Sequence, residues 1–487
     1  MKKFISILLL FLSLTLHAET FYICHLNDFH GYLYQGDNCQ IAKIETLFKG
    51  ISLRHCPCLF FDSGDFLSGS VYANYFQGES VARIFEMMPF TFHTFGNHEF
   101  DYPSPRLKEL SEKYHLPFLS TNVVPKVDFP IVSSTIMTIG YKKIGILGLT
   151  TEDAASLSNP KATCDFSFLK VTAETAKILK EFKKKGTDFI IAVSHLGFVE
   201  DKKLAGKFPQ IDLILGGHSH DVIEKPYRTG NTTIVQAGTQ GQYIGFLKIS
   251  IEAKKTVTGG LIEVKPYLMD DPFIKPIAEE YRAKLKAALG QPIATLLEPL
   301  PVDPGVNRGE TKIGNLLTDA IRLETGADIA MLNAGGIRKS LPQGTITGED
   351  LYNTLPFNNS VVFYRLDKKE ITEMIKHGLN AAVDESIHGR FAVVSGISYR
   401  ASLKNSSEGL IIERDGKPLE EGRTYLVAVP DFIADGGDGY TVFKGKKQVD
   451  NQFNGIEIRE LVRSYLVKNP NPKPVLEGRI DVKTDPL

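Results

Sequence analysis

The sequence predicts two α/β domains joined by a helix. Its 487 residues exceed what a single domain usually holds. Short apolar runs that end in Gly-rich or polar turns alternate with helical patterns, and this alternation is typical of α/β domains. Near residues 266–276, three prolines and an acidic pair interrupt the alternation, which indicates a boundary between the domains.

The composition is that of an ordinary globular protein, with 43% hydrophobic and 23% charged residues. A disordered, collagen-like or multi-span membrane protein is therefore excluded. Lys and Arg number 56 and Asp and Glu number 57, so the net charge is close to zero. A chain without excess positive charge offers no electrostatic surface for a nucleic acid polymer or an anionic membrane.

Residues 1–18 have the features of a signal peptide. Lys2 and Lys3 precede a 13-residue apolar run, and Ala18 is a small residue suited to a cleavage site. The run is too short to span a bilayer, and no second run of spanning length follows it. We therefore expect cleavage after Ala18, no stable membrane insertion afterwards, and a periplasmic or secreted, extracellular protein.

All five cysteines lie in the first third of the chain, where an exported protein can form disulfides. The odd number leaves at least one thiol unpaired, and the spacing does not indicate which cysteines pair. They are Cys24, Cys39, Cys56, Cys58 and Cys164.

The first domain is expected over residues 19–265. Its apolar runs are short and bounded by turn residues, which favours buried strands, and Val171–Lys185 has a helical pattern between two of them. The expected strands are Phe21–Leu26, Leu59–Phe61, Phe92–Phe95, Ile144–Leu149, Phe189–Val193, Ile211–Leu215 and Ile234–Ala237. Strands and helices in this order predict a layered α/β domain.

A connecting helix is expected within residues 266–295, and the second domain over residues 296–487. Pro276 suits the first turn of a helix, and Gly290 suits its end. Between them, apolar residues recur every four positions, at Ile277, Tyr281, Leu285 and Leu289. In the second domain we expect helices over Gly314–Thr325 and Lys369–Ala381, and strands over Ile329–Leu332 and Val361–Leu366.

Polar, chemically active segments directly follow five of the expected strands. Because strand ends of an α/β sheet meet at one edge, we expect these segments to lie close together. They are NDFHG at 27–31, DSGD at 62–65, GNHEFD at 96–101, SHLG at 194–197 and GGHSH at 216–220.

These segments are rich in metal ligands. Asp28 and His30 are two residues apart, as are His218 and His220, so extended backbone would project each pair from one side. Imidazole and carboxylate ligands favour zinc, manganese or iron-type ions. A carboxylate can bridge two such ions, and Asn supplies a neutral oxygen ligand. Four of the histidines outside these segments are expected to be structural or superficial: His25, His55, His93 and His115.

The five segments, followed by GNLLTDA, NAGGIR, LPFNN, GRFAVVSG and FIADGGDGY, resemble the 5'-nucleotidase family. The resemblance covers essentially the whole mature chain. It implies an N-terminal metallophosphoesterase domain with sandwiched β-sheets flanked by helices. It also implies a C-terminal α/β nucleotide-binding domain.

The resemblance implies a centre with two divalent metal ions, Zn, Mn or Co. Asp28, His30 and His220 would hold one ion, although some relatives have Gln at the position of His220. Asp65 would bridge the two ions. The ligands of the second ion would be Asn97, His195 and His218. His98 and Asp101 match the catalytic pair of the family.

In the second domain the resemblance implies a nucleotide site. Phe357 and Phe432 would stack on both faces of the base, and Arg338 would bind phosphate. The expected base or ribose contacts are Asn333, Asn359 and Asp438. Relatives have further arginines near GNLLTDA, where this chain offers Arg308 and Lys312.

The implied activity is hydrolysis of nucleoside monophosphates to nucleoside and phosphate, with nucleotide sugars or di- and triphosphates as further substrates. One alternative is a 2',3'-cyclic-nucleotide 2'-phosphodiesterase with 3'-nucleotidase activity, which uses similar motifs. The other is a surface protein that binds nucleotides without catalysis, which the complete set of candidate ligands argues against. The sequence does not indicate an oligomeric state.

Overall fold

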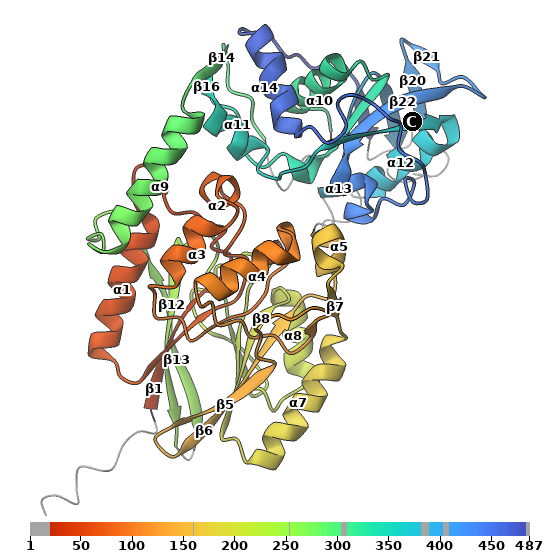
Figure 1. The fold of residues 1–487 in the computed structure, drawn as a ribbon. Coiled ribbons are helices and arrows are strands. Elements are labelled where there is room, and N and C mark those ends of the chain that lie inside the picture. The colour runs from red at the N-terminus through yellow and green to blue at the C-terminus, as the bar shows by residue number, and fades with distance from the viewer. Residues whose placement is uncertain are drawn as a thin grey trace, which may run out of the picture. The chain divides into compact units, whose positions relative to one another are not determined.

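The computed structural model describes residues 20–158, 160–252, 254–302, 309–380, 389–402 and 409–483. The expected signal peptide, Arg308 and Ala381 lie outside the described residues. The chain forms two compact units (Figure 1). Unit 1 contains the residues up to Ser68, Gln77–Ala154 and Asp165–Glu279. Unit 2 contains Gly69–Phe76, Ala155–Cys164 and the residues from Glu280 onwards.

Unit 1 is built on two large β-sheets. The first sheet has the strand order β13 (Lys255–Glu263), β12 (Tyr243–Ile251), β1 (Thr20–Leu26), β2 (Cys58–Asp62) and β3 (Phe92–His93). The second sheet has the order β10 (Tyr227–Thr229), β11 (Thr232–Val235), β9 (Leu213–Leu215), β8 (Phe189–His195), β6 (Lys142–Thr150) and β5 (Ser134–Ile139). A small pair joins β4 (Val123–Pro125) to β7 (Phe166–Phe168).

The two sheets of unit 1 share a core of alternating strand residues. Phe21 and Ile23 of β1 pack in one cluster with Ile144 of β6 and with Ile191 and Val193 of β8. Because successive side chains of a strand point to opposite faces, the residues between them face outward from this core. Most of them are buried as well, so both sheets are covered on their outer faces.

Helices form those outer layers. Against the first sheet, the ring of Phe48 in α1 (Gln40–Arg54) lies 5.0 Å from the ring of Phe60. Against the second, α7 (Val171–Lys185) and α8 (Phe198–Lys207) pack on the outward residues of β6 and β8. The remaining helices of this unit are α3 (Glu79–Phe85), η1 (His98–Asp101) and α4 (Ser104–Lys113). The predicted pair of sandwiched sheets flanked by helices is confirmed.

Unit 2 centres on a four-stranded sheet with the order β17 (Val361–Asp367), β22 (Thr424–Pro430), β15 (Ile329–Asn333) and β18 (Ala392–Ser395). A second sheet has the order β21 (Lys417–Pro418), β20 (Ile411–Arg414), β19 (Ser398–Ser402) and β23 (Ile480–Lys483), and β14 (Pro292–Leu296) pairs with β16 (Gly344–Thr347). The helices are α2 (Val71–Tyr75), α6 (Pro160–Thr163), α10 (Lys312–Thr325), η2 (Ala334–Gly336), α11 (Gly348–Thr354), α12 (Lys368–Asn380), α13 (Asp431–Ala434), η5 (Gly437–Gly439) and α14 (Ile458–Lys468).

The central sheet of unit 2 is covered on both faces. Ile329 and Met331 of β15 join a cluster that contains α12, whereas Ala330 and Leu332 join a cluster that contains α10 and α14. Strand β15 therefore has no polar face, as its continuous apolar sequence predicts. The predicted α/β class of the second domain is confirmed.

The expected connecting helix is α9 (Ile274–Leu289), and the division between the two units falls within it, after Glu279. It begins two residues before Pro276 because Asp271 accepts the backbone N–H groups of Phe273 and Ile274 at 3.0 and 3.1 Å. Lys49 of α1 also binds Asp271, at 2.6 Å. Another short helix at a unit boundary is α5 (Ala154–Leu157).

Most expected elements are present, with shifted ends. The helix Val171–Lys185 has the expected bounds, and the helices expected from Gly314 and Lys369 begin at Lys312 and Lys368. The strand expected over Phe92–Phe95 is only two residues long, because the chain turns into the GNHEFD segment after His93. In the described part of the chain, no helix has the length and apolar character needed to cross a membrane.

Candidate functional site

The five polar segments of unit 1 meet where the edges of its two sheets approach each other. β1, β2 and β3 run parallel, and so do β8 and β9, so each group delivers its C-terminal residues to one edge. His195 Nε2, at the end of β8, lies 3.1 Å from Asp65 Oδ2, after β2. His220 Nε2 lies 3.3 Å from Asp28 Oδ1, after β1. Side chains from both sheets therefore form one cluster.

The backbone of this cluster is left-handed, so the expectation that Asp28, His30, His218 and His220 project from extended backbone is wrong. Tight loops replace extended chain, held by hydrogen bonds from Asp28 N to Gly64 O and from His30 N to Asp65 O. The φ angles are 50° for Asp28, 49° for His30, 58° for Asp65, 78° for His218 and 58° for His220. Such residues cost about 1–3 kcal/mol each and persist where the surroundings enforce them, commonly at functional sites.

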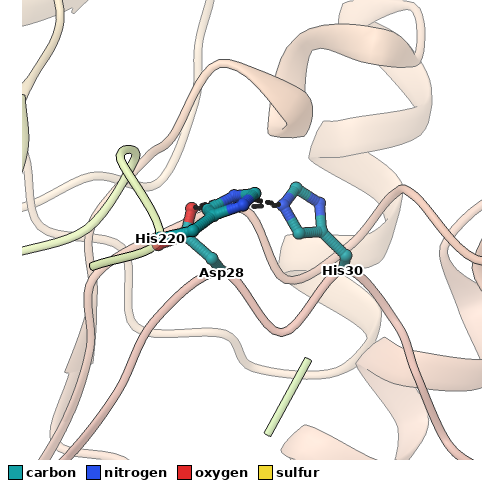
Figure 2. A group of neighbouring side chains, drawn as sticks. All are labelled: Asp28, His30 and His220. Atoms are coloured by element: carbon teal, nitrogen blue, oxygen red, sulfur yellow. Dashed lines mark hydrogen bonds and ion pairs between the residues drawn. The ribbon is translucent and has the colours of Figure 1, made fainter. Parts of the chain in front are cut away.

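The first group of ligand-type atoms belongs to Asp28, His30 and His220, which lie within 4.8 Å of one another. Figure 2 shows the ring of His220 between the other two side chains. Its Nε2 lies 3.2 Å from His30 Nε2 and 3.3 Å from Asp28 Oδ1. Asp28 and His30 are buried, whereas the side chain of His220 is 38% exposed. The group is therefore reachable from solvent on the His220 side.

The second group belongs to Asp65, His195 and His218, whose ligand atoms also lie within 4.8 Å of one another. Asp65 is a member of a further group, with His30 and His98. Asn97 is buried in the loop after β3. The geometry thus places Asp65 at the junction of the two expected ligand sets.

The hydrogen bonds of the imidazoles indicate that this cluster fits a cation. His195 Nδ1 lies 2.6 Å from the carbonyl of Ser63, so Nδ1 carries a proton. The other ring nitrogen, Nε2, faces Asp65 Oδ2 at 3.1 Å. Either a proton or a metal ion must lie between these two groups, and imidazole plus carboxylate is a ligand set that suits a divalent metal.

The pKa values describe the same groups when no metal ion is bound. Burial opposes the charged form of His195, but the carboxylates of Asp65 and Asp28 outweigh it and raise its pKa to about 10. Burial lowers the pKa of His30 to about 3 and that of His218 to about 4. Without a bound metal, a proton on His195 would balance the buried carboxylates; His30 and His218 are neutral, the form that binds metals.

His98 and Asp101 form an oriented pair beside the cluster. His98 Nδ1 lies 2.8 Å from Asp101 Oδ2, and the hydroxyl of Ser68 donates to the same oxygen at 2.6 Å. The backbone N–H of His98 donates to Asp65 Oδ1 at 2.8 Å. Asp101 therefore binds Nδ1, and His98 belongs to one ligand group together with His30 and Asp65.

Glu99 is a site residue to which the sequence motifs assign no role. Its buried carboxylate accepts four backbone N–H groups, which belong to Gly96 at 2.7 Å, Asp65 and Phe66 at 2.9 Å, and Leu67 at 3.2 Å. It therefore ties the DSGD loop to the GNHEFD loop. The sequence places Glu99 in the GNHEFD segment but does not reveal its role, because three of its backbone partners lie more than 30 residues away.

Glycines in these motifs allow the loops to approach closely. A Cβ on Gly96 would lie 2.1 Å from Asp65 Oδ1. A Cβ on Gly217 would lie 2.9 Å from Ser63 O and 3.1 Å from His195 Nδ1. Both positions therefore require glycine for the ligands to converge.

The histidines expected to be structural or superficial lie outside the ligand groups formed by the described residues. His25 and His93 are fully buried, and burial lowers their pKa values to about 4 and 3. His55 packs against the Tyr22 ring, and His115 pairs with Glu86. In the described part of the chain, Cys24, Cys39, Cys56 and Cys58 form no disulfide.

Unit 2 contains a small pocket that brings together three of the expected substrate residues, Asn333, Phe357 and Asn359. Leu332, Gly336, Leu355, Pro430, Ile458 and Arg459 complete its wall. Asn333 donates to Asp438 Oδ2 at 2.8 Å, so a fourth expected residue adjoins it.

The other two expected substrate residues are not in the wall of this pocket. The ring of Phe432 lies over Gly437, where a Cβ would be 2.5 Å away. Arg338 has an exposed side chain, although its backbone N–H binds Thr354 O at 2.8 Å. Lys312, which the sequence offers near GNLLTDA, pairs with Glu298 at 2.7 Å.

Two family models match the chain. The model described as calcineurin-like phosphoesterase matches residues 21–222, and the model described as 5'-nucleotidase, C-terminal domain, matches residues 292–445. The first match contains all seven candidate metal ligands and the second contains all six candidate substrate residues.

Known proteins resemble the chain over nearly its whole length. A snake venom 5'-nucleotidase of Naja atra is 26% identical, with 94% of this chain and 98% of that protein covered. The trifunctional nucleotide phosphoesterase YfkN of Bacillus subtilis is 28% identical over 94% of this chain, which spans only 34% of YfkN. The crystal structure of a 5'-nucleotidase precursor from Thermus thermophilus has 29% identity and a TM-score of 0.84, with 96% of this chain and all of that chain covered.

Proposed function

Because the chain belongs to the 5'-nucleotidase family and is a phosphoric ester hydrolase, we propose that it hydrolyses nucleoside 5'-monophosphates to nucleoside and phosphate. The observation that carries this proposal is the cluster of buried carboxylates and imidazoles in unit 1, a ligand set that suits divalent metal ions. Nucleotide sugars and di- or triphosphates are further substrates in this proposal.

The proposed cofactors are two divalent metal ions, with Zn, Mn and Co as candidates. Asp28, His30 and His220 would hold one ion, Asn97, His195 and His218 would hold the second, and Asp65 would be a ligand of both. When bound, the two ions would activate a water as nucleophile and neutralise charge on the phosphate.

The proposed roles of His98 and Asp101 follow from their orientation. Asp101 accepts the Nδ1 proton of His98 and holds the ring beside the ligand groups. A proton on Nε2 can then stabilise charge on the transferring phosphoryl group or pass to the leaving oxygen. Ser68 supports the pair by donating to Asp101.

Unit 2 recognises the nucleoside in this proposal. Phe357 and Phe432 stack on the base, and Asn333, Asn359 and Asp438 bind the base or ribose. Arg338 binds phosphate, for which a planar guanidinium is well suited. The hydrogen bond between Asn333 and Asp438 and the pocket beside Phe357 support these roles.

The proposed protein is exported to the periplasm or the cell exterior, with residues 1–18 as its signal peptide. Its working parts are a metal-binding domain over residues 19–265 and a nucleotide-binding domain over residues 296–487. Residues 266–295 connect them, and α9 supports this assignment. The venom protein among its relatives is compatible with an exported enzyme.

The test is phosphate release from AMP, 3'-AMP, cyclic 2',3'-AMP and UDP-glucose by chelator-treated enzyme to which single metal ions are returned. We expect no activity without metal, and fastest release from AMP with Zn, Mn or Co. Preference for cyclic 2',3'-AMP and 3'-AMP would instead establish the phosphodiesterase alternative. Full activity after complete metal removal would contradict the proposed centre.

A further inference from the structure

Arg459, the second residue of α14, is a buried charge in an unusual position. This residue is only 2% exposed. Burying a guanidinium costs several kcal/mol unless it is paired, and a cation in the first turn of a helix opposes the helix dipole. The rest of the buried face of α14 is apolar, with Ile458, Leu461 and Val462 in the core. Stability of the helix itself therefore does not account for an arginine at this position.

The guanidinium donates hydrogen bonds to one loop and to the residue before α14. Nη1 donates to the carbonyls of Leu355 and Phe357, both at 2.7 Å. Nη2 donates to the side chain of Asn358 and to Glu457 Oε2, the latter at 2.9 Å. The planar fork of an arginine can serve two carbonyls and a side-chain oxygen together, which a lysine cannot do.

The loop held in this way carries Phe357 and Asn359, which line the pocket of unit 2. Two more of its carbonyls are bound: Pro356 O accepts from Asn74 Nδ2 at 2.6 Å, and Asn359 O accepts from the N–H of Ile458 at 3.0 Å. Loops normally satisfy their carbonyls with water, so binding of carbonyl after carbonyl by protein groups fixes the loop's conformation.

An aromatic ring also packs against the guanidinium of Arg459. The guanidinium carbon lies 3.7 Å from the centroid of the Tyr352 ring, in α11. Tyr75 of α2 packs against Tyr352 at a centroid distance of 5.7 Å. The arginine is thus held on one face by stacking while its edge binds the loop, which leaves it little freedom to change partners.

We propose that Arg459 is a positioning residue for nucleobase recognition: it holds the loop 355–359 so that Phe357 is preorganised to stack on the base. The proposal rests on the proposed function and extends it to a residue outside the expected substrate contacts. It assigns to Arg459 an effect on affinity for the nucleoside part of the substrate and none on the metal centre.

The test compares Arg459→Lys with the wild-type enzyme on two substrates, AMP and ribose 5-phosphate, which lacks the base. Because lysine retains the charge but loses the fork, we expect the KM for AMP to rise about tenfold with kcat within about twofold. The kcat/KM for ribose 5-phosphate should stay within about twofold. Arg463→Lys is the matched control, since Arg463 lies on the same helix, is 52% exposed and pairs only loosely with Glu460 at 3.8 Å.

A milder variant guards against loss of folding. Asn358→Ala removes one partner of Arg459 at an exposed position, so the KM for AMP should rise about two- to threefold without change for ribose 5-phosphate. If Arg459→Lys does not fold, this variant decides the question. Equal losses on both substrates, or an unchanged KM for AMP, would overturn the positioning role.

Calorimetric titration with adenosine separates this proposal from the proposed function. Wild-type enzyme that hydrolyses no nucleotide but binds adenosine, with weaker binding by Arg459→Lys, would contradict the proposed function alone. Hydrolysis of AMP together with equal adenosine affinities of the two proteins would contradict the role of Arg459 alone.

Discussion

His98 and Glu99 are adjacent in sequence but contact different parts of the site. His98 presents a ring nitrogen to the ligand groups, whereas Glu99 accepts backbone N–H groups of two loops that carry candidate metal ligands. One side chain is therefore placed for chemistry and the other for the shape of the loops. Substitutions at the two positions should have separable effects.

We expect His98→Ala to retain its metal ions while kcat falls by about 10²–10⁴-fold, the usual contribution of a general acid. Glu99→Gln should instead weaken metal retention by about 10–100-fold. The amide nitrogen of the glutamine would be a donor facing a backbone N–H, which is also a donor, so one hydrogen bond would be lost. Metal content after passage through dilute chelator, measured beside steady-state kinetics, distinguishes the two. Loss of metal from His98→Ala, or full retention by Glu99→Gln, would refute these roles.

At the scale of elements, a single carboxylate joins α3 to α4. Glu79, in the first turn of α3, lies 2.8 Å from Lys113 Nζ and from the Tyr114 hydroxyl, and 3.2 Å from Arg106 Nη2. The hydrogen bond from Lys113 is the largest cause that lowers the pKa of Glu79 to about 2, from a usual value of 4.5. The folded protein therefore favours the charged form of this group.

Glu79→Gln should reduce the free energy of unfolding of unit 1 by about 1 kcal/mol at pH 7, because a network of several charged groups contributes more stability than a single surface ion pair. Because the folded-state pKa is depressed, the stabilisation is complete above pH 4.5 and is lost as the pH falls toward 2. Urea unfolding of wild type and variant at pH 7 and at a pH of about 3 should show a difference that shrinks in acid.

The control is Glu109→Gln, because Glu109 is 55% exposed and makes one surface pair with Arg106 at 2.9 Å. It should change stability by less than about 0.5 kcal/mol at either pH. A difference between wild type and Glu79→Gln that grows in acid would show that the sign of the linkage is wrong.

At the scale of the whole molecule, each unit has its own hydrophobic cores. Unit 1 is built around the space between its sheets and the layer under α7 and α8, and unit 2 around the two faces of its central sheet. The candidate metal ligands belong to unit 1 and the candidate nucleoside contacts to unit 2. Metal and nucleoside should therefore stabilise different units.

We expect scanning calorimetry of metal-free protein to show two transitions. Addition of Zn or Mn should raise the midpoint of one transition and adenosine that of the other, since a ligand stabilises only the unit that binds it. A ligand at about 100 times its Kd contributes about 2.7 kcal/mol, which corresponds to a shift of roughly 5–10 °C for units of this size. A shift of the same transition by both ligands would contradict the assignment of metal binding to unit 1 and nucleoside binding to unit 2.

Much of the fold could be predicted because local patterns specify it. The helix Val171–Lys185 and the strands around Ile144 and Phe189 follow from apolar periodicity alone. The long hairpin of β12 and β13 was not predicted, since Gly259 and Gly260 look like a break in a strand. Pairing with β12 keeps them in the sheet, and a Cβ on Gly259 would lie 2.1 Å from Phe246 O. Long-range pairing overrides the local preference there.

The order and residue types of the motifs, from NDFHG to FIADGGDGY, already specify metal-type ligands, aromatic residues and two α/β domains. Three features appear only in the folded chain. They are the left-handed backbone at Asp28 and His218, the hydrogen bonds that Glu99 accepts from other loops, and the hydrogen bond from Arg459 to Leu355. The physical reason is separation along the sequence. A periodic pattern acts over a few residues, whereas these contacts join segments up to about a hundred residues apart, which packing alone brings together.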